Sequence, residues 1–454
     1  MATVNPQAAS SAPLEHDARL ISADHAPVSS AEIAIAVVIG RTSEAFDFFV
    51  FGIASVLVFP ALVFPFADPL TATLYSFAIF GLAFVARPIG SVLFMAVDRR
   101  HGRGVKLTIA LFLLGTSTVA ISFLPAYSEV GSASIIMLMV CRVGQGLALG
   151  GAWDGLASLL ALNAPQNRRG WYAMIPQLGH PFGFIVASGL FAFFLLNLNS
   201  DDFLSWGWRY PFFVAFTINV VALFARLRMV ATEEFAALLE TRDLKPAYVS
   251  EIVKKQGINL LLGAFVPLAS FALFHLVTIF PLSYIGLFTD RTPGEFLLVQ
   301  LEGAVIGAVA ITLSGLIADR IGRRNLLGLG AGSIAIFSLF TPMLLGGGAL
   351  GQTTFVFIGF ALLGLSFGQA AGAVASNFSS QNRYTGSALT NDLAWLVGAG
   401  FAPLVALAFY DRFGLWAVGA YLLSGAICTL AALAINKRLE AQHSQHSAVG
   451  DDAL

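Results

Sequence analysis

Three ionisable residues interrupt a mostly apolar segment near the start of the chain. Arg41, Glu44 and Asp47 lie within residues 31–59. On a helix, Glu44 is one turn from each of the other two, so either pair can meet. Two acids and one base leave a surplus carboxyl, and a poorly hydrated carboxyl can bind and release a proton near neutral pH. We expect Glu44 or Asp47 to carry protons; the alternative is a static ion cluster with Arg41 that stabilises helix packing.

Arg142 lies about halfway along a second apolar segment, residues 132–161. A guanidinium there suits a ligand carboxylate, because it can donate two parallel hydrogen bonds. The alternative is an internal partner for Asp47 or Glu44, and one arginine can serve both in turn. Arg41 is a second candidate for binding an anion.

A third apolar segment carries Gln177 and His180 between Pro176 and Pro181. Helices broken by proline expose backbone groups to a cavity, and histidine titrates in the useful pH range. We therefore expect Gln177 to bind a ligand and His180 to take part in proton transfer; the alternative is a hydrogen-bonded packing role.

Four further polar residues in apolar segments are weaker candidates. Asn391 is expected to line the other side of a cavity, whereas Asp392 suits a gating or packing contact. Arg87, next to Pro88, suits a structural role. Asp154 is a further possible site residue.

The composition identifies the environment of these residues. Of 454 residues, 57% are apolar and 11% are charged, against about 25% charged in a typical soluble domain. The net charge of −1 gives no reason to expect nucleic acid as a partner. Two cysteines inside apolar runs indicate packing rather than a metal site. The chain is expected to be embedded in the lipid bilayer.

A membrane-spanning helix needs about 20 mostly apolar residues. Twelve such segments are expected, near residues 31–59, 70–97, 105–125, 132–161, 169–197, 207–228, 257–288, 294–318, 324–346, 352–376, 384–410 and 414–436. The longest polar interval, 229–256, is expected to be a cytoplasmic linker between an N-terminal six-helix bundle, 31–228, and a C-terminal one, 257–436. Residues 1–30 are expected to form a disordered cytoplasmic tail, and 437–454 a cytoplasmic tail.

Lysine and arginine in the loops indicate orientation, because cytoplasmic loops are enriched in both. With both termini inside, the inner loops hold eighteen of these residues, including Arg99, Lys106 and Arg226. The opposite loops hold three, Arg209, Arg291 and Arg412. Both termini are therefore expected in the cytoplasm.

A loop sequence occurs twice, 220 residues apart, in Arg100–Arg103 and Arg320–Arg323. A repeat at equivalent places in each half is typical of transporters built from parallel repeats. The glycines permit a tight turn, and the acids and arginines can pair or cap helix ends. Asp98, Arg100 and Arg103, with Asp319, Arg320 and Arg323, are therefore expected to form gating contacts.

The second copy, Gly315–Arg324, resembles the signature loop of the major facilitator superfamily. Further segments are similar to its metabolite:proton symporter family: Glu44–Phe49, Ala86–Gly90, Arg142–Gly151, Arg168–Gly170 and Trp206–Phe212. The resemblance implies the major facilitator fold. It also implies proton-driven uptake of citrate, 2-oxoglutarate, shikimate-like acids, proline or betaines.

The chain departs from this family at two places. The first loop copy has Met95 for a glycine and Arg99 for an aspartate, with Asp98 one place early. Where the family has Gly-Gly-Glu-Trp-Gly-Gly-Ala, this chain has Gly150–Leu156, which moves the acid by two residues to Asp154. The proton site and the substrate are left open by these changes.

These patterns together predict an all-α integral membrane protein with twelve transmembrane helices. The predicted function is import of a small carboxylate-bearing metabolite by proton symport through alternating access, in a cell (inner) membrane. An exporter or exchanger of the same fold, or a non-transporting sensor, is the alternative. No cofactor, metal, nucleic acid or obligate protein partner is expected. An enzyme is not expected, since no metal cluster, nucleophile–base pair or phosphate-binding loop is visible.

Overall fold

A computed structural model describes residues 30–153, 157, 160, 164–230, 246–370, 378 and 382–451. Within these ranges every regular element is helical. The predicted linker therefore lies mostly outside the described residues, as does almost all of the tail 1–30.

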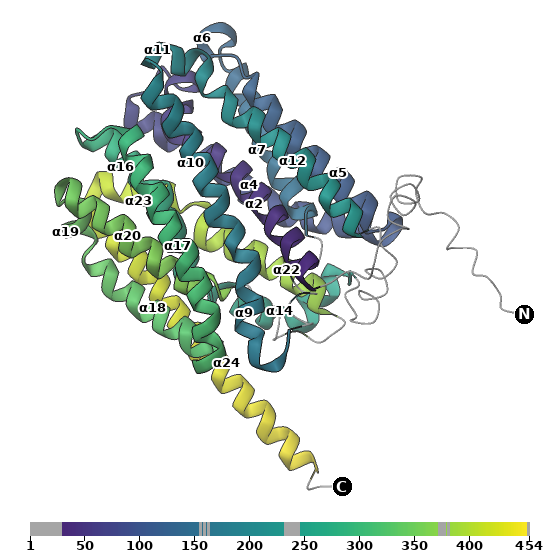
Figure 1. Ribbon diagram of the computed structural model, residues 1–454. Coiled ribbons are helices and arrows are strands. Elements are labelled where there is room, and N and C mark those ends of the chain that lie inside the picture. Colours follow the sequence, from purple (N-terminus) through teal and green to yellow (C-terminus); the bar gives the residue numbers. More distant parts are fainter. Residues whose placement is uncertain are drawn as a thin grey trace, which may run out of the picture.

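The first half of the chain contains six long helical segments (Figure 1). They are α2 (Ser30–Leu57), α4 (Pro69–His101), α5 (Arg103–Ser122), α7 (Ala133–Gly151), α9 with α10 (Arg169–Met174, Gly179–Asn197) and α12 (Arg209–Val230). The short helices α3 (Phe59–Val63), α6 (Tyr127–Val130) and α11 (Ser200–Asp202) lie at one end of this bundle.

The second half repeats this plan. Its segments are α14 (Val249–Phe265), α15 (Leu268–Thr278) and α16 (Phe280–Phe288), then α17 (Pro293–Ile321), α18 with α19 (Arg323–Leu339, Thr341–Leu345), α20 (Gly348–Phe367), α22 with α23 (Arg383–Ala394, Ala402–Phe413) and α24 (Leu415–Asp451). In Figure 1, α24 extends beyond the bundle toward the C-terminus.

Ten of the described helices are long and apolar enough to cross a membrane. Two further segments complete the expected twelve. The first is α2, which has 28 residues but carries Arg41, Glu44 and Asp47 in its central part. The second is α18 with α19, in which a break near Phe340 divides the span into 17 and 5 residues. The chain is thus an all-α membrane protein with two bundles of six spans.

Two predicted spans contain breaks. In the fourth span, expected over 132–161, α7 ends at Gly151 and Trp153 is not helical, whereas residues 157 and 160 are helical and the others between 154 and 161 lie outside the described residues. The seventh span is divided at Pro267, between α14 and α15, and again near Ile279. Proline removes a backbone donor and crowds the preceding turn, so a break at Pro267 follows from the sequence.

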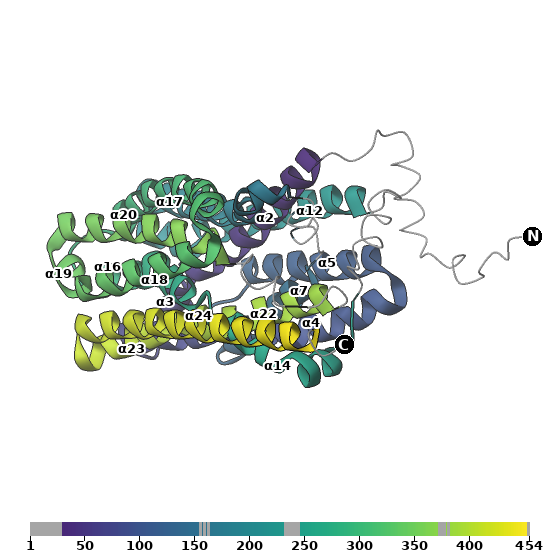
Figure 2. The same cartoon turned by 90° about the horizontal axis from the view of Figure 1, so that it is seen from below.

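The two halves meet along paired helices (Figures 1 and 2). Helix α10 packs along α17, and α4 packs against α22 and α23. Within the first half, Gly146 and Gly150 of α7 face the backbone of α4 so closely that a Cβ would collide with it. The glycine run of α7 therefore serves close helix packing.

Both copies of the repeated loop turn at a glycine with positive φ, 85° at Gly102 and 86° at Gly322. Other residues rarely adopt this conformation. The two turns end α4 and α17 and begin α5 and α18. The face of the molecule that carries them is called the loop face below.

Candidate functional site

A cavity lies between the two halves, with about 1020 Å³ of space including its open part. Residues of α2, α4, α7 and the turn before α10 line it from the first half, and residues of α15 and α22 from the second. Its polar lining residues include six of the predicted site residues: Arg41, Glu44, Arg87, Gln177, His180 and Asn391. The six come from four separate places in the sequence, so the fold assembles the cavity.

Glu44 holds two arginines at the edge of this cavity. Its Oε2 accepts from Arg41 at 2.8 Å, and its Oε1 accepts from Arg226 at 2.6 Å. Gly40 lies one turn earlier on α2, and the Arg226 guanidinium lies directly against it, in space that a Cβ would fill. Arg226 was assigned to a cytoplasmic loop from its place in the sequence. It is instead 2% exposed and forms an ion pair inside the bundle.

Asp47 has different surroundings, although it is only one turn from Glu44. It is 1% exposed, and its carboxyl accepts hydrogen bonds from neutral groups. Thr118 Oγ1 and Asn219 Nδ2 (3.3 Å) donate to Oδ1, and Gln145 Nε2 (3.4 Å) donates to Oδ2. Among the described residues, Asp47 forms no ion pair. It can therefore gain or lose a proton without breaking one.

Arg142 is connected to Asp47 through Gln145. Its Nη1 donates to Gln145 Oε1 at 3.0 Å, and its Nε donates to the Phe80 carbonyl at 3.1 Å. The guanidinium carbon lies 4.0 Å from the centre of the Phe51 ring, a cation–π contact. Arg142 is fully buried and does not line the cavity in this conformation. In this conformation Gln145 lies between Arg142 and Asp47, and both expected roles of Arg142 stay predictions.

Arg87 and Asp392 join the two halves. Arg87 Nε donates to Asp392 Oδ1 at 2.7 Å, and Ser91 donates to Asp392 Oδ2. The Arg87 guanidinium also lies 5.9 Å from the centre of the Trp395 ring, which lines the cavity. The pair connects α4 to α22, so it must break or move if the halves separate on the loop face.

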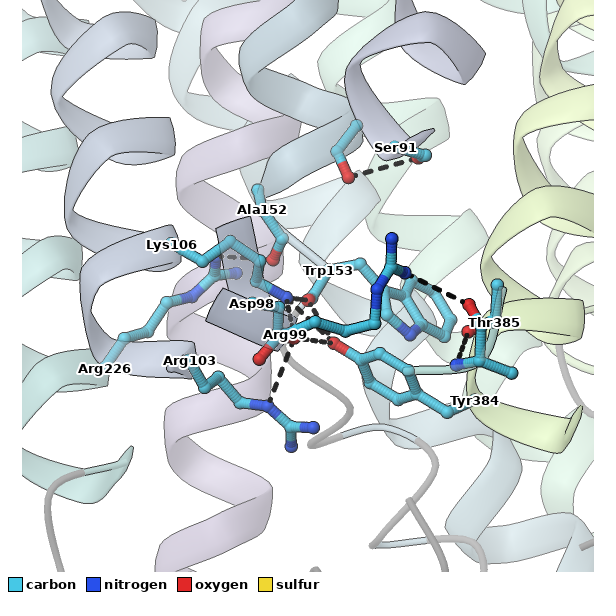
Figure 3. Close-up of polar contacts among 12 residues, drawn as sticks. Ser91, Asp98, Arg99, Arg103, Lys106, Ala152, Trp153, Arg226, Tyr384 and Thr385 are labelled. Atoms are coloured by element: carbon cyan, nitrogen blue, oxygen red, sulfur yellow. Dashed lines mark hydrogen bonds and ion pairs between the residues drawn. The ribbon is translucent and has the colours of Figure 1, made fainter. Parts of the chain in front are cut away.

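The first copy of the repeated loop forms a second connection between the halves (Figure 3). Lys106 Nζ donates to Asp98 Oδ2 (3.1 Å), the Tyr384 hydroxyl (2.8 Å) and the Trp153 carbonyl (2.5 Å). The Tyr384 hydroxyl also donates to the Trp153 carbonyl at 3.0 Å. Arg103 lies 3.8 Å from Asp98. These residues, Asp98, Arg103, Lys106, Trp153 and Tyr384, are called the loop-face latch below.

The second copy joins the halves through the backbone. Asp319 accepts from the backbone N–H groups of Gly170 (2.6 Å) and Trp171 (3.2 Å) in the first turn of α9. A carboxylate is favourable there because a helix N-terminus presents unpaired N–H groups. Arg323 donates to the Arg169 carbonyl and to Gln369 Oε1, each at 3.3 Å.

The remaining predicted residues lie as follows. Gln177 and Asn391 face the cavity from opposite halves, and His180 stacks on Trp395 with ring centres 5.8 Å apart. Arg100 and Arg320 are exposed on the loop face. Asp154 lies outside the described residues.

Sequence reasoning missed several residues that complete these networks: Thr118, Gln145, Asn219, Lys106 and Tyr384. Asn219 is an amide in the middle of a mostly apolar span, which is a usable signal. Gln145 belongs to a segment that was singled out, but its bridging position depends on two other helices. Lys106 was counted as a loop charge, although it is 2% exposed.

Comparison with sequence families and curated proteins gives several matches, including the following three. The family described as "Sugar (and other) transporter" matches residues 33–240. The inner membrane metabolite transport protein YhjE of Escherichia coli (strain K12) is 36% identical over 420 residues, which cover 90% of this chain and 95% of YhjE. The shikimate transporter of the same organism is 30% identical over 409 residues, 87% of this chain and 91% of that protein.

Comparison with solved structures gives the same fold. The crystal structure of a D-xylose-proton symporter matches with a TM-score of 0.68 at 18% identity. The match covers 88% of this chain and 96% of the symporter.

Proposed function

We propose that this chain, which belongs to the major facilitator superfamily of membrane transporters, imports a small carboxylate-bearing metabolite by proton symport. The chain is a multi-pass inner-membrane transporter and not an enzyme. The parts that are proposed are the class of substrate, the coupling of its transport to protons and the direction of transport. The alternative is an exporter or exchanger of the same fold, or a sensor that binds without transport.

One observation supports proton coupling above the others. Asp47 is buried among neutral donors, whereas Glu44 and Asp392 are each paired with arginine. Burying a charge is costly unless it is paired, so a buried acid without a cation is suited to exchange protons. Gln145 joins Asp47 to Arg142, and a change of charge at one is felt at the other.

Alternating access is supported by where the halves touch. The loop-face latch and the Arg87–Asp392 pair lie on one side of the cavity. On the other side, Phe49 stacks on Phe274 across the halves with ring centres 5.5 Å apart. Rocking of one half against the other would release these two sets of contacts in turn.

The substrate class is supported by the cavity and by the relatives. Arg41 and Arg87 line the cavity, and arginine suits carboxylates because of its paired donors. One relative is a shikimate transporter and another a metabolite transport protein. We also propose that the loop face is cytoplasmic, because it carries the basic turns at Arg99–Arg103 and Arg320–Arg324.

Proteoliposomes with an enclosed pH dye test this proposal. The panel is citrate, 2-oxoglutarate, shikimate, succinate, proline and betaine. We expect one carboxylate to cause inward acidification that is absent in Asp47→Asn. Substrate movement without acidification would indicate an exchanger. Binding without movement would indicate a sensor.

A further inference from the structure

Three residues that line the cavity each carry a buried polar atom without a hydrogen-bond partner among the described residues. The three atoms are Trp153 Nε1, His180 Nδ1 and Ser387 Oγ. An unsatisfied buried polar group is costly, and native structures contain few of them. Three around one cavity indicate a ligand that supplies their partners.

The Trp153 indole indicates that the ligand carries an anionic group. An indole nitrogen is a donor only, so its partner must be an acceptor. The Arg41 guanidinium lies over the same ring, 5.4 Å from its centre. A guanidinium and an N–H on two neighbouring side chains can together bind a carboxylate.

Trp153 is also held in place by the latch. Its carbonyl accepts hydrogen bonds from Lys106 and from Tyr384. Those bonds fix the backbone of a residue whose side chain lines the cavity. The residue therefore connects a bound anion to closure of the loop face.

Ser387 presents a second polar group from the opposite half. It lies on α22, one turn before Asn391, which also lines the cavity. A hydroxyl can donate and accept, so a ligand hydroxyl suits it. Between the two polar ends the lining is aromatic, including Phe84, Phe271 and Trp395. Such rings suit a compact carbon skeleton.

We propose that the cavity binds a compact hydroxy acid, with its carboxylate between Arg41 and the Trp153 indole and a hydroxyl on Ser387. This inference rests on the proposed transport of a carboxylate and narrows it to a hydroxylated one. Such a ligand bridges the two halves and satisfies donors that each half leaves unpaired.

Calorimetric titration of the purified full-length chain with two acids tests the proposed binding residues. Shikimate carries three hydroxyls on a ring, and cyclohex-1-ene-1-carboxylate has the same ring and carboxylate without them. We expect the wild type to bind shikimate at least about 10-fold more tightly, since a site built for hydroxyls discriminates against analogues that lack them.

Two variants separate the role of the Ser387 hydroxyl from that of the Trp153 N–H. Ser387→Ala is expected to weaken shikimate binding about 5- to 10-fold and to change binding of the other acid less than about 2-fold. Trp153→Phe retains the ring and removes the N–H, so both acids are expected to bind about 10-fold more weakly or worse. Matched controls are Ser424→Ala and Trp416→Phe, both at exposed positions of α24.

Equal loss of both acids in Ser387→Ala, or unchanged binding in Trp153→Phe, would overturn the inference. The inference would also be overturned if the wild type bound neither acid but transported another carboxylate together with protons. In that case the proposed proton symport would still stand. If shikimate binds and the two variants change its binding as expected, but no protons move, the proposed binding residues would be supported and proton symport would be contradicted.

Discussion

Glu44 and Asp47 are one turn apart on α2, yet the fold gives them opposite surroundings. Glu44 lies between two guanidiniums at the cavity edge, with Arg226 at 2.6 Å and Arg41 at 2.8 Å. Asp47 is buried among a hydroxyl and two amides. The same carboxyl group thus forms an ion cluster in one case and, in the other, accepts hydrogen bonds with no ion pair among the described residues.

This difference supports a proposal for the two roles that the sequence left open. An acid between two cations loses much favourable interaction if it is protonated, so it is suited to holding α2 against α12. An acid among neutral donors loses no ion pair, so it is suited to carrying a proton. We therefore place proton coupling at Asp47 and helix packing at Glu44.

The largest expected effect is on stability at Glu44. Glu44→Gln removes the acid and leaves a buried arginine charge uncompensated, which costs about 3–5 kcal/mol. Asp47→Asn keeps a neutral side chain among neutral donors, and we expect its melting temperature to stay close to that of the wild type. Thermal unfolding of both variants in detergent measures the contrast, with the exposed Glu302→Gln as control. Equal losses would remove the distinction between the two acids.

A double variant sharpens the assignment of Glu44. In Glu44→Gln with Arg226→Gln the unpaired charge is also removed, so stability should recover relative to the sum of the single variants. For groups in direct contact, interaction energies of about 0.5–3 kcal/mol are usual. A double-variant cycle by thermal unfolding measures this energy. Simple additivity would mean that the pair does not stabilise the bundle.

A smaller effect is expected around Asp47. Thr118→Val removes one donor to the Asp47 carboxyl and keeps the side-chain shape. The expected result is a change of a few-fold in proton-driven uptake, in line with about 1 kcal/mol for one hydrogen bond. Thr116→Val is the matched control, because Thr116 bonds only to carbonyls of its own helix. Initial uptake rates at several external pH values measure the effect, and equal rates in both variants would count against a role for Thr118.

The sequence predicted the helical architecture well, for a physical reason. In a bilayer every backbone group of a span must be satisfied within the helix, so long apolar runs translate directly into spans. Breaks within spans are harder to place from that rule. Helix α7 ends at Gly151, and the seventh span breaks at Pro267 and near Ile279.

The candidate site was only partly predictable. Periodicity placed Arg41 and Glu44 together, because both lie on one helix. It did not place Arg226 beside Glu44, or Asn219 and Thr118 beside Asp47, because those contacts depend on how α5 and α12 pack on α2. Charge counting also treated Arg226 and Lys106 as loop residues, since a basic residue near a span end looks the same whether it is exposed or buried.

The central claim, that Asp47 carries the coupled proton, is tested most directly by comparing two modes of transport in one variant. Asp47→Asn proteoliposomes should lose uptake driven by a proton gradient and retain counterflow exchange of labelled substrate, which needs no net proton movement. Retained gradient-driven accumulation in Asp47→Asn, with its loss in Glu44→Gln, would contradict the account and move the proton site to Glu44.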